Sequence, residues 1–573
     1  MAAEKNGGRD NIALPELLAP CGSPEALDAA LLGGADAVYL GTKVFNARMN
    51  ARNFEGDALK AAIEKAHGKG VRVYVTMNTA ITDRQLYDAL TEASRLCELG
   101  ADALIVADLG FAAAIRKYLP ELAIHASTQC SAHSLDGVKF LAETGFSRVV
   151  IARELSKANI EYIINNSPVP IETFVHGAMC VSASGQCLLS SFIGGRSGNR
   201  GECAQPCRMK YNNGYPLSLK DMCLAGHITG IISSGVASLK IEGRMKSPEY
   251  VYNVTSVYRR LLDQRRDASE KEIKLLEASF SRGGFSDGYY TGKHTSMNGV
   301  RSESDKAAGR ELKTVMKPSG RKLPAIQTEE RKILPFTAKE LNKKEEAPEF
   351  TPVRSARWYR PENICGEGFF GINYIPLDAF EKYSANGVLF PPVIPDGELA
   401  GVIKKLERAK SRGAVHALIG NIGQTALAKS LGFTVHGDYR LNIFSNATAK
   451  VFCDLADIIL SPELIIPQMR DIAAKKGVII YGRMPLMTLE KRVGAAALTD
   501  RTGARFPIIS EGGRDILLNS VPTYTADMKA KMKAIGRFNE HFIFTTETRD
   551  QALDIINRYK KGQSADTAIR RIK

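Results

Sequence analysis

A chain of 573 residues is too long for one hydrophobic core, so its length excludes a single domain and predicts roughly two to four. The composition, with 44% hydrophobic and 24% charged residues, is that of an ordinary globular protein. A formal net charge of +15 favours polyanionic partners such as RNA, although a basic soluble protein without such a partner explains it equally well.

The N-terminus and the apolar runs predict where the protein works. The first stretch, MAAEKNGGRDNIALPELLAP, lacks the apolar segment of a signal peptide, and no apolar run is long enough to span a bilayer. We therefore expect a cytoplasmic protein with no membrane partner, in which thiols stay reduced.

Residues 12–265 alternate short apolar runs with amphipathic segments, several of which end in glycine as helices often do. Apolar strands that alternate with helices predict a parallel sheet covered by helices, and eight such runs predict a closed (β/α)8 TIM-like barrel. An open doubly wound sheet is the alternative, but the first turn does not look like a dinucleotide site. The eight runs are ELLAP, DAVYLG, VRVYVTMN, DALIVAD, LAIHASTQ, SRVVIARE, IETFVHG and ASLKIEG.

Half of the ten cysteines lie between residues 180 and 223. The segment 178–223 follows the seventh predicted strand, at the barrel face where active sites occur. Cysteines gathered in a reduced compartment favour metal binding or catalysis over disulfides. Four thiolates suit zinc or an iron–sulfur cluster, and only Cys203 and Cys207 have a zinc-like spacing, so the wide spacing of the rest favours a 4Fe-4S cluster. Buried, inert cysteines are the structural alternative.

Four stretches of the sequence resemble the peptidase U32 family, also called collagenase-like peptidases, and the resemblance covers 14–300. Residues 430–525 resemble the C-terminal part of the family's long members. The stretches are ETFVHGAMCVSASGQCLLSS, GNRGECAQPCRMKY, LSLKDMCL and SLKIEGRMKSPEYVYNVTSVYRRLLD.

The resemblance implies hydroxylation more than proteolysis. Several family branches look like hydroxylation proteins for rRNA cytidine, tRNA uridine or ubiquinone precursors, some of them linked to prephenate, and carry a 4Fe-4S cluster on four cysteines. Mapped residue by residue, it implies Cys180, Cys187, Cys203 and Cys223 as the metal ligands, with Cys207 as the substitute for Cys223.

Further candidates lie at the predicted strand ends. Strand alternation sends Lys240 and Glu242 to the same side, where a Lys–Glu pair could bind an acid or move protons, unless it is a structural ion pair. His176, after the seventh strand, is an acid–base candidate or a hydrogen-bonded structural histidine. The predicted catalytic residues are thus Glu242, Lys240 and His176, and the predicted substrate-binding residues are Asn78, Gln129, Arg208, Arg244 and Lys246.

The rest of the chain predicts a connection and charged linker at 266–365, a second unit at 366–530 and a helical basic tail at 531–573 that leans towards nucleic acid. The second unit echoes the first in order and shows six convincing strands, so we expect a degenerate barrel-like α/β domain without its own thiol site. The corresponding pairs are His125 with His436, Glu154 with Glu463, and Gly177 with Gly482.

The sharpest functional prediction is an iron–sulfur enzyme that hydroxylates a pyrimidine in rRNA or tRNA, with prephenate as a candidate co-substrate. One alternative is a collagenase-like peptidase, although neither H-E-x-x-H nor G-x-S-x-G occurs. Others are hydroxylation of a small aromatic or quinone precursor, and a non-catalytic RNA-binding scaffold.

Overall fold

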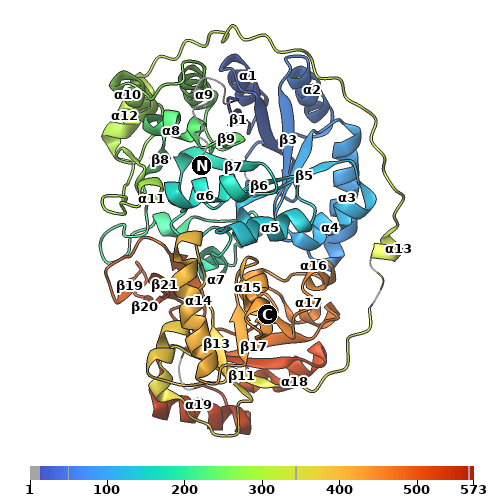
Figure 1. Ribbon diagram of the computed structural model, residues 1–573, viewed down its shortest axis with the longest axis vertical. Coiled ribbons are helices and arrows are strands. Elements are labelled where there is room, and N and C mark those ends of the chain that lie inside the picture. Colours follow the sequence, from blue (N-terminus) through green and yellow to red (C-terminus); the bar gives the residue numbers. More distant parts are fainter. Residues whose placement is uncertain (1–12, 50, 342, 344, 566–567, 573) are drawn as a thin grey trace, which may run out of the picture.

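The computed structural model describes residues 13–49, 51–341, 343, 345–565 and 568–572. It contains two closed barrels of eight parallel strands, the first coloured blue to green and the second orange to red in Figure 1. The ring of the first barrel closes where β9 pairs with both β1 and β7, so the predicted N-terminal (β/α)8 barrel is confirmed. Its strands are β1 Glu16–Pro20, β2 Ala37–Gly41, β3 Arg72–Met77, β4 Ala103–Val106, β5 Ala123–Ala126, β6 Arg148–Val150, β7 Ile171–Ala178 and β9 Ser238–Ile241.

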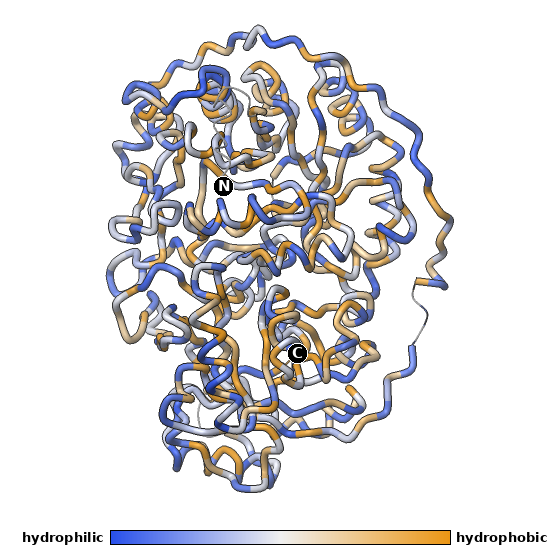
Figure 2. The backbone as a smooth tube through the Cα atoms, in the orientation of Figure 1, coloured by the Kyte–Doolittle hydropathy of each residue, from blue (hydrophilic) through white to orange (hydrophobic). Residues whose placement is uncertain are grey.

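The helices of the first barrel bury one apolar face against these strands. In α3, apolar residues recur every three or four positions from Leu86 to Leu96 and are buried, and Thr82 with Gln85 forms a capping box at its start. In Figure 2 the barrel strands are largely hydrophobic, whereas hydrophilic residues recur along the helices. The helices are α1 Pro24–Leu32, α2 Gly56–His67, α3 Asp83–Glu98, α4 Leu109–Tyr118, α5 Leu135–Glu143, α6 Lys157–Asn166, α8 Ile228–Ser233 and α9 Pro248–Asp263.

Two short strands flank the first ring without belonging to it. β8 (Asp221–Cys223) runs antiparallel to β7, and β10 (Phe285–Ser286) pairs with β8. Cys223 therefore ends a strand, and a short 3-10 helix (Ala225–His227) and then α8 (from Ile228) follow it. The nearby helices are α7 Leu189–Gly194, α10 Glu270–Ser279 and α11 Gly288–Thr291.

The predicted second barrel-like α/β domain is confirmed, and it is a complete barrel, with strands in addition to the six that were convincing within 366–530. Two of its strands fall outside that range, because β11 precedes it and β23 lies in the predicted tail, where it inserts between β11 and β17. Trp358 of β11 stacks on Phe544 of β23 with ring centroids 4.2 Å apart. The strands are β11 Arg354–Trp358, β12 Ile372–Pro376, β13 Gly387–Leu389, β14 His416–Ile419, β15 Thr434–Gly437, β16 Asp457–Ile459, β17 Lys476–Gly482 and β23 Asn539–Phe544.

An antiparallel sheet and a set of helices complete the second unit. The sheet comprises β18 Pro485–Leu489, β19 Ala497–Thr499, β20 Arg505–Glu511 and β21 Arg514–Leu518, in the order β18-β21-β20-β19. β22 (Thr523–Tyr524) pairs with the end of β17. The helices are α14 Asp396–Ser411, α15 Gln424–Ser430, α16 Asn446–Val451, α17 Ile466–Asp471, α18 Lys529–Met532 and α19 Arg549–Lys561.

The predicted internal repeat has structural counterparts. His125 and His436 are each the third residue of their strand, β5 and β15. Gly177 and Gly482 close β7 and β17 with positive φ angles of 107° and 143°. A Cβ on either glycine would lie 2.5 Å from a backbone carbonyl oxygen of the adjacent strand segment, that of Glu242 or of Ile543. Both positions therefore require glycine for the same reason.

The two barrels meet at the C-terminal ends of their strands through reciprocal contacts. Asp83, the first residue of α3, accepts a hydrogen bond from the backbone N–H of Asn446 at 2.8 Å. Asp396, the first residue of α14, accepts one from the backbone N–H of Leu135 at 3.0 Å. Asn446 and Leu135 are themselves the first residues of α16 and α5, so the contacts are related by an approximate two-fold axis.

The predicted linker is an ordered strap. After α12 (Glu303–Glu311), residues 312–337 run extended around the first barrel to α13 (Ala338–Leu341), on the outside in Figure 1. Its backbone N–H groups cap the last carbonyls of three helices, and its apolar side chains, such as Leu323 and Phe336, pack on the first barrel. The capping hydrogen bonds are Ser319 to Leu32 at 2.9 Å, Ile326 to His67 at 3.0 Å and Leu334 to Tyr118 at 2.8 Å.

The described part of the C-terminal tail folds back onto the protein. Arg570 forms a β-bridge with Thr523, and its guanidinium lies 3.8 Å from the centre of the Phe192 ring in α7. Residues 566, 567 and 573 of the predicted basic tail lie outside the described residues. Within the described part of the chain, no helix has the length and apolar character needed to cross a membrane.

Candidate active site

A cavity of about 290 Å³ opens at the C-terminal end of the first barrel. Four cysteines of segment 178–223 line it, and we call it the thiol cavity. Nine of the residues predicted from the sequence line it, together with Cys207. These ten residues are Cys180, Cys187, Cys203, Cys207, Asn78, Gln129, Arg208, Lys240, Glu242 and Arg244.

The four thiols of the cavity are free and close enough to influence one another. Desolvation raises the pKa of the Cys207 thiol to about 12, and the neighbouring Cys180 and Cys203 contribute. Desolvation raises the pKa of Cys187 well above its ordinary value, with contributions from the other three thiols. Thiols in such a group stay protonated until a cation compensates the charge of their thiolates.

The arrangement bears on which metal group could fit. Among the described residues, no three His, Cys, Asp or Glu side chains stand close enough together to hold a single metal ion. A four-iron cluster takes one thiolate on each iron, so its ligands surround a larger body than one ion. Four thiols line this one cavity, and four is the number of thiolates that a 4Fe-4S cluster takes.

Cys223 and His176 are not among the residues that line the thiol cavity, a position that favours the two predicted alternatives, Cys207 as a ligand and His176 as a structural histidine. They face each other across β7 and β8. The Cys223 sulfur is 3.9 Å from the Tyr258 hydroxyl, and His176 Nδ1 is 3.4 Å from the same oxygen. Burial, with a smaller effect of Lys246, lowers the pKa of His176 to about 3, so it is a neutral, packed histidine.

Lys240 and Glu242 both reach the cavity but do not pair with each other. The Lys240 ammonium donates to Glu172 at 2.7 Å, whereas Glu242 accepts from Arg153 at 2.7 Å and has Arg48 at 3.5 Å. Burial raises the pKa of Glu242, but the guanidiniums around it outweigh that effect and hold it at about 2. Glu242 is therefore an anion at neutral pH, able to accept hydrogen bonds but not to donate a proton.

Arg244 and Arg208 play different parts. Arg244 is buried and donates to the Thr76 hydroxyl at 2.9 Å and to Asn46 at 3.1 Å, both neutral partners. Burial lowers the pKa of Arg244 to about 10, and it remains a cation at neutral pH. Arg208 donates to Ser218 at 3.1 Å and to the Met179 carbonyl at 2.9 Å, so it fixes the cysteine-bearing segment.

The remaining predicted residues divide between the cavity wall and its surroundings. Asn78 accepts from the Ala47 N–H at 3.0 Å and donates to Ser127 at 3.3 Å, which fixes its amide in the wall. Lys246 lies outside, its ammonium 2.7 Å from the centre of the Phe280 ring, and burial lowers its pKa to about 7. Its prediction as a substrate-binding residue is not supported by this position.

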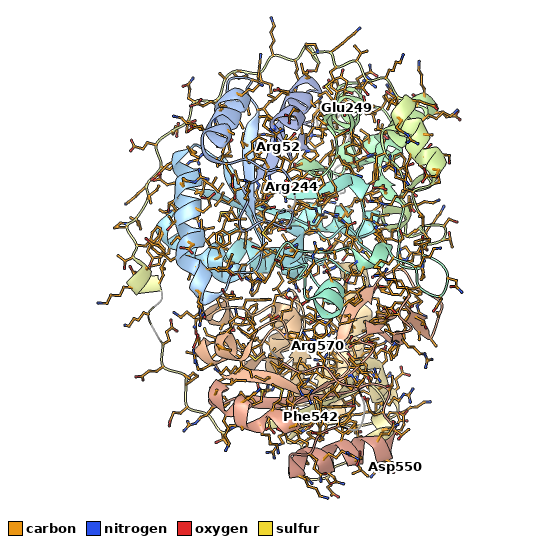
Figure 3. The ribbon with its side chains drawn as sticks, turned by 180° about the vertical axis from the view of Figure 1, so that it is seen from behind. Arg52, Arg244, Glu249, Phe542, Asp550 and Arg570 are labelled. Carbon is orange, nitrogen blue, oxygen red and sulfur yellow. The ribbon has the colours of Figure 1, made fainter. Side chains whose placement is uncertain are left out.

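Sequence reasoning missed two cations of the wall, Arg48 and Arg153. Arg153 directly follows the strand-like run SRVVIA, so the rule that strand ends carry the site could have found it. Figure 3 shows Arg244 in the first barrel, with Phe542 and Arg570 in the second.

Comparisons with known proteins match the part of the chain that builds this cavity. The family model described as Peptidase family U32 matches residues 22–298. The 23S rRNA 5-hydroxycytidine C2501 synthase of Escherichia coli (strain K12) is 40% identical over 259 residues, which cover 43% of this chain and 39% of that protein. The tRNA hydroxylation protein P1 of Bacillus subtilis (strain 168) is 38% identical over 275 residues, covering 45% of this chain and 65% of that protein.

Another relative has a different name, and the similarity to solved structures is low. The Collagenase of Porphyromonas gingivalis (strain ATCC BAA-308 / W83) is 34% identical over 313 residues, covering 48% of this chain and 74% of that protein. A solved U32 peptidase structure matches with 17% identity and a TM-score of 0.27, covering 31% of this chain and 73% of that one. That structural similarity supports no argument.

Proposed function

This chain belongs to peptidase family U32, and on that premise we propose that it is an enzyme that hydroxylates a pyrimidine in RNA by means of an iron–sulfur cluster. The observation that carries the proposal is the meeting of four thiols in one cavity at the mouth of the first barrel. Relatives named for rRNA and tRNA hydroxylation match this barrel, and the net charge of +15 suits an RNA substrate.

The residues that would hold a 4Fe-4S cluster are Cys180, Cys187, Cys203 and Cys207. This ligand set replaces Cys223 by Cys207, because the Cys223 sulfur lies against Tyr258 outside the cavity. When bound, the cluster would supply one-electron redox chemistry at the cavity wall.

The rest of the cavity favours an anionic reactant. Arg48, Arg153, Lys240 and Arg244 line it, against the carboxylates of Glu242 and the adjacent Glu172. Arg244 has only neutral hydrogen-bond partners, so its charge is available to a phosphate or to the carboxylates of a small acid such as prephenate. Glu242, held as an anion, can accept a hydrogen bond from a base or a sugar.

The cavity disfavours the peptidase activity that the family name implies. A cysteine protease needs a thiol with a lowered pKa beside a histidine. Burial instead raises the pKa of Cys180, Cys187 and Cys207, and His176 lies outside the cavity. We therefore place RNA hydroxylation ahead of proteolysis.

Two measurements test the proposal. Protein purified without oxygen should contain iron and sulfide and show a broad visible absorbance that dithionite bleaches; a colourless protein with stoichiometric zinc would refute the cluster. Mass spectrometry of rRNA and tRNA nucleosides should show one hydroxylated pyrimidine missing from a strain without the gene. That nucleoside should return with the wild-type gene but not with Cys180→Ser, and an unchanged nucleoside profile would exclude the RNA substrate.

A further inference from the structure

The second barrel touches the cysteine-bearing segment next to its thiols. The backbone N–H of Ala183 donates to the Thr488 carbonyl of β18 at 2.7 Å, and that of Leu188 donates to the Leu486 carbonyl at 2.8 Å. These bonds tie the residues that lie between Cys180 and Cys187, and the residue after Cys187, to a strand of the other domain. A segment with little regular structure of its own gains a fixed partner in this way.

A second contact lies just beyond Cys207. The Asn212 N–H donates to the Thr499 carbonyl of β19 at 3.0 Å, and the Asn212 side chain accepts from the Thr499 N–H at 2.8 Å. The rings of Tyr211 and Phe506 meet edge to face with centroids 6.3 Å apart. The antiparallel sheet β18–β21 therefore holds the cysteine-bearing segment at two places, one around Cys187 and one just beyond Cys207.

Met487 is a residue of the second domain that lines the thiol cavity itself. It stands between Leu486 and Thr488, whose carbonyls hold the segment, and it is buried. The sheet follows β17 in the second barrel as the cysteine-bearing segment follows β7 in the first. The two insertions occupy equivalent places in the repeat and pack on each other.

We propose that the sheet β18–β21 is a clamp that sets the positions of the four thiols, and that Met487 is a wall of the site in which they bind metal. This rests on the proposed function for the identity of the metal group, but not for the clamping itself. The second barrel, whose cysteines Cys365 and Cys453 do not line the thiol cavity, would then act as the positioning partner of the first, and its residues Met487, Thr499 and Phe506 would belong to the site.

The test compares full-length variants. Phe506→Ala with Asn212→Ala weakens the contact beyond Cys207, and Met487→Ala opens the cavity wall, with Met487→Leu as the conservative variant. Ile509→Ala is the matched control, because Ile509 lies in the same sheet and is an odd number of residues from Phe506, so it faces the other way. Thermal unfolding by circular dichroism identifies any variant that fails to fold.

Timed alkylation of each thiol in metal-free protein, read by mass spectrometry, is the first measurement. We expect Cys187 and Cys207 to react about tenfold faster in the Phe506→Ala/Asn212→Ala variant, with Cys97 unchanged as the internal reference. Equal rates in all folded variants would overturn the clamp. Because this measurement needs no metal, it stands even if the cluster does not.

The second measurement is iron content after anaerobic reconstitution. We expect Met487→Ala and the double variant to retain less iron than wild type, while Met487→Leu and Ile509→Ala retain wild-type amounts. Faster alkylation in a protein whose wild type binds no iron would support the clamp and refute the proposed function. Full iron retention by every variant would refute the role of Met487.

Discussion

The reciprocal contacts between the barrels make stability depend on pH in a definable way. Desolvation raises the pKa of Asp83 to about 6 and that of Asp396 to about 6, in both cases against the hydrogen bonds that they accept from backbone N–H groups. The pKa of an aspartate side chain in the unfolded chain is about 3.9. The folded state therefore holds each proton more tightly than the unfolded state, so the stability contributed by these groups is present at low pH and lost as pH rises through about 6.

The magnitude follows from the linkage between protonation and folding. Between pH 5 and pH 7 each carboxyl ionises in the folded protein, whereas in the unfolded chain it is already ionised. That interval spans about one pH unit of linkage below the folded pKa, or at most about 1 kcal/mol for each aspartate, because both side chains are only partly buried and solvent screens their charges. Asp83→Asn and Asp396→Asn keep an oxygen that accepts the N–H but remove the charge, so the two substitutions together should remove about 1–2 kcal/mol of pH dependence.

The assay is urea unfolding at pH 5 and pH 7 for wild type, each single variant and the double variant. Circular dichroism follows the whole chain, and fluorescence follows Trp358, the single tryptophan, in the core of the second barrel. The wild type should lose stability relative to the double variant between the two pH values. The approximate two-fold axis requires the two single variants to behave alike. A difference between wild type and double variant that does not change with pH would refute the reasoning from buried carboxyls.

Three further predictions concern single positions. Cys207→Ser should abolish iron binding on anaerobic reconstitution while Cys223→Ser retains it, because of these two cysteines Cys207 lines the thiol cavity and Cys223 does not. The reverse result would restore Cys223 as the ligand. Arg357→Met should cost the second barrel about 1.5–3 kcal/mol, measured by Trp358 fluorescence in urea, since it removes one of the two buried guanidiniums that meet the Asp438 carboxylate, at 2.6 Å, and leaves Arg440 as the other; a loss under 1 kcal/mol would contradict this. Gly70→Ala should destabilise the chain by about 1–3 kcal/mol in thermal unfolding, because the residue has a φ of +71° and an added Cβ would lie 2.4 Å from Leu323 of the strap. Gly194→Ala is the control and should leave the stability unchanged, because, apart from its own helix, no atom lies within 4 Å of an added Cβ there.

The first barrel could be predicted because each strand is a short apolar run set between helical patterns. The cavity residues could be predicted because strand ends of a barrel share one face, and that rule placed Asn78, Lys240 and Glu242 correctly. Cys223 was misplaced because its segment is a three-residue strand whose antiparallel partner β7 lies far away in sequence. Periodicity carries no information about such a pairing.

The second barrel was underestimated for a similar reason. β23 is the sequence NEHFIF, which lies between charged segments and gives no sign that it would insert between β11 and β17. The partners of Lys240 and Glu242 could not be read from alternation either, because Glu172 lies on β7 and Arg153 lies in the turn after β6. Strand alternation predicts the side that a residue faces but not the residue that it meets.

The two barrel mouths use buried charge differently, and the difference suits the second barrel to support the thiol cavity of the first. In the mouth of the second barrel, Arg357 and Arg440 both bind the carboxylate of Asp438, at 2.6 Å and 2.9 Å, so these buried charges are paired within the barrel. In the first mouth Arg244 has neutral partners, and its charge remains available to a ligand. A barrel whose buried charges are already paired is suited to hold the sheet that carries Met487 against the thiols. If the second barrel bound a ligand and changed its conformation, the sheet would move and the thiols would move with it.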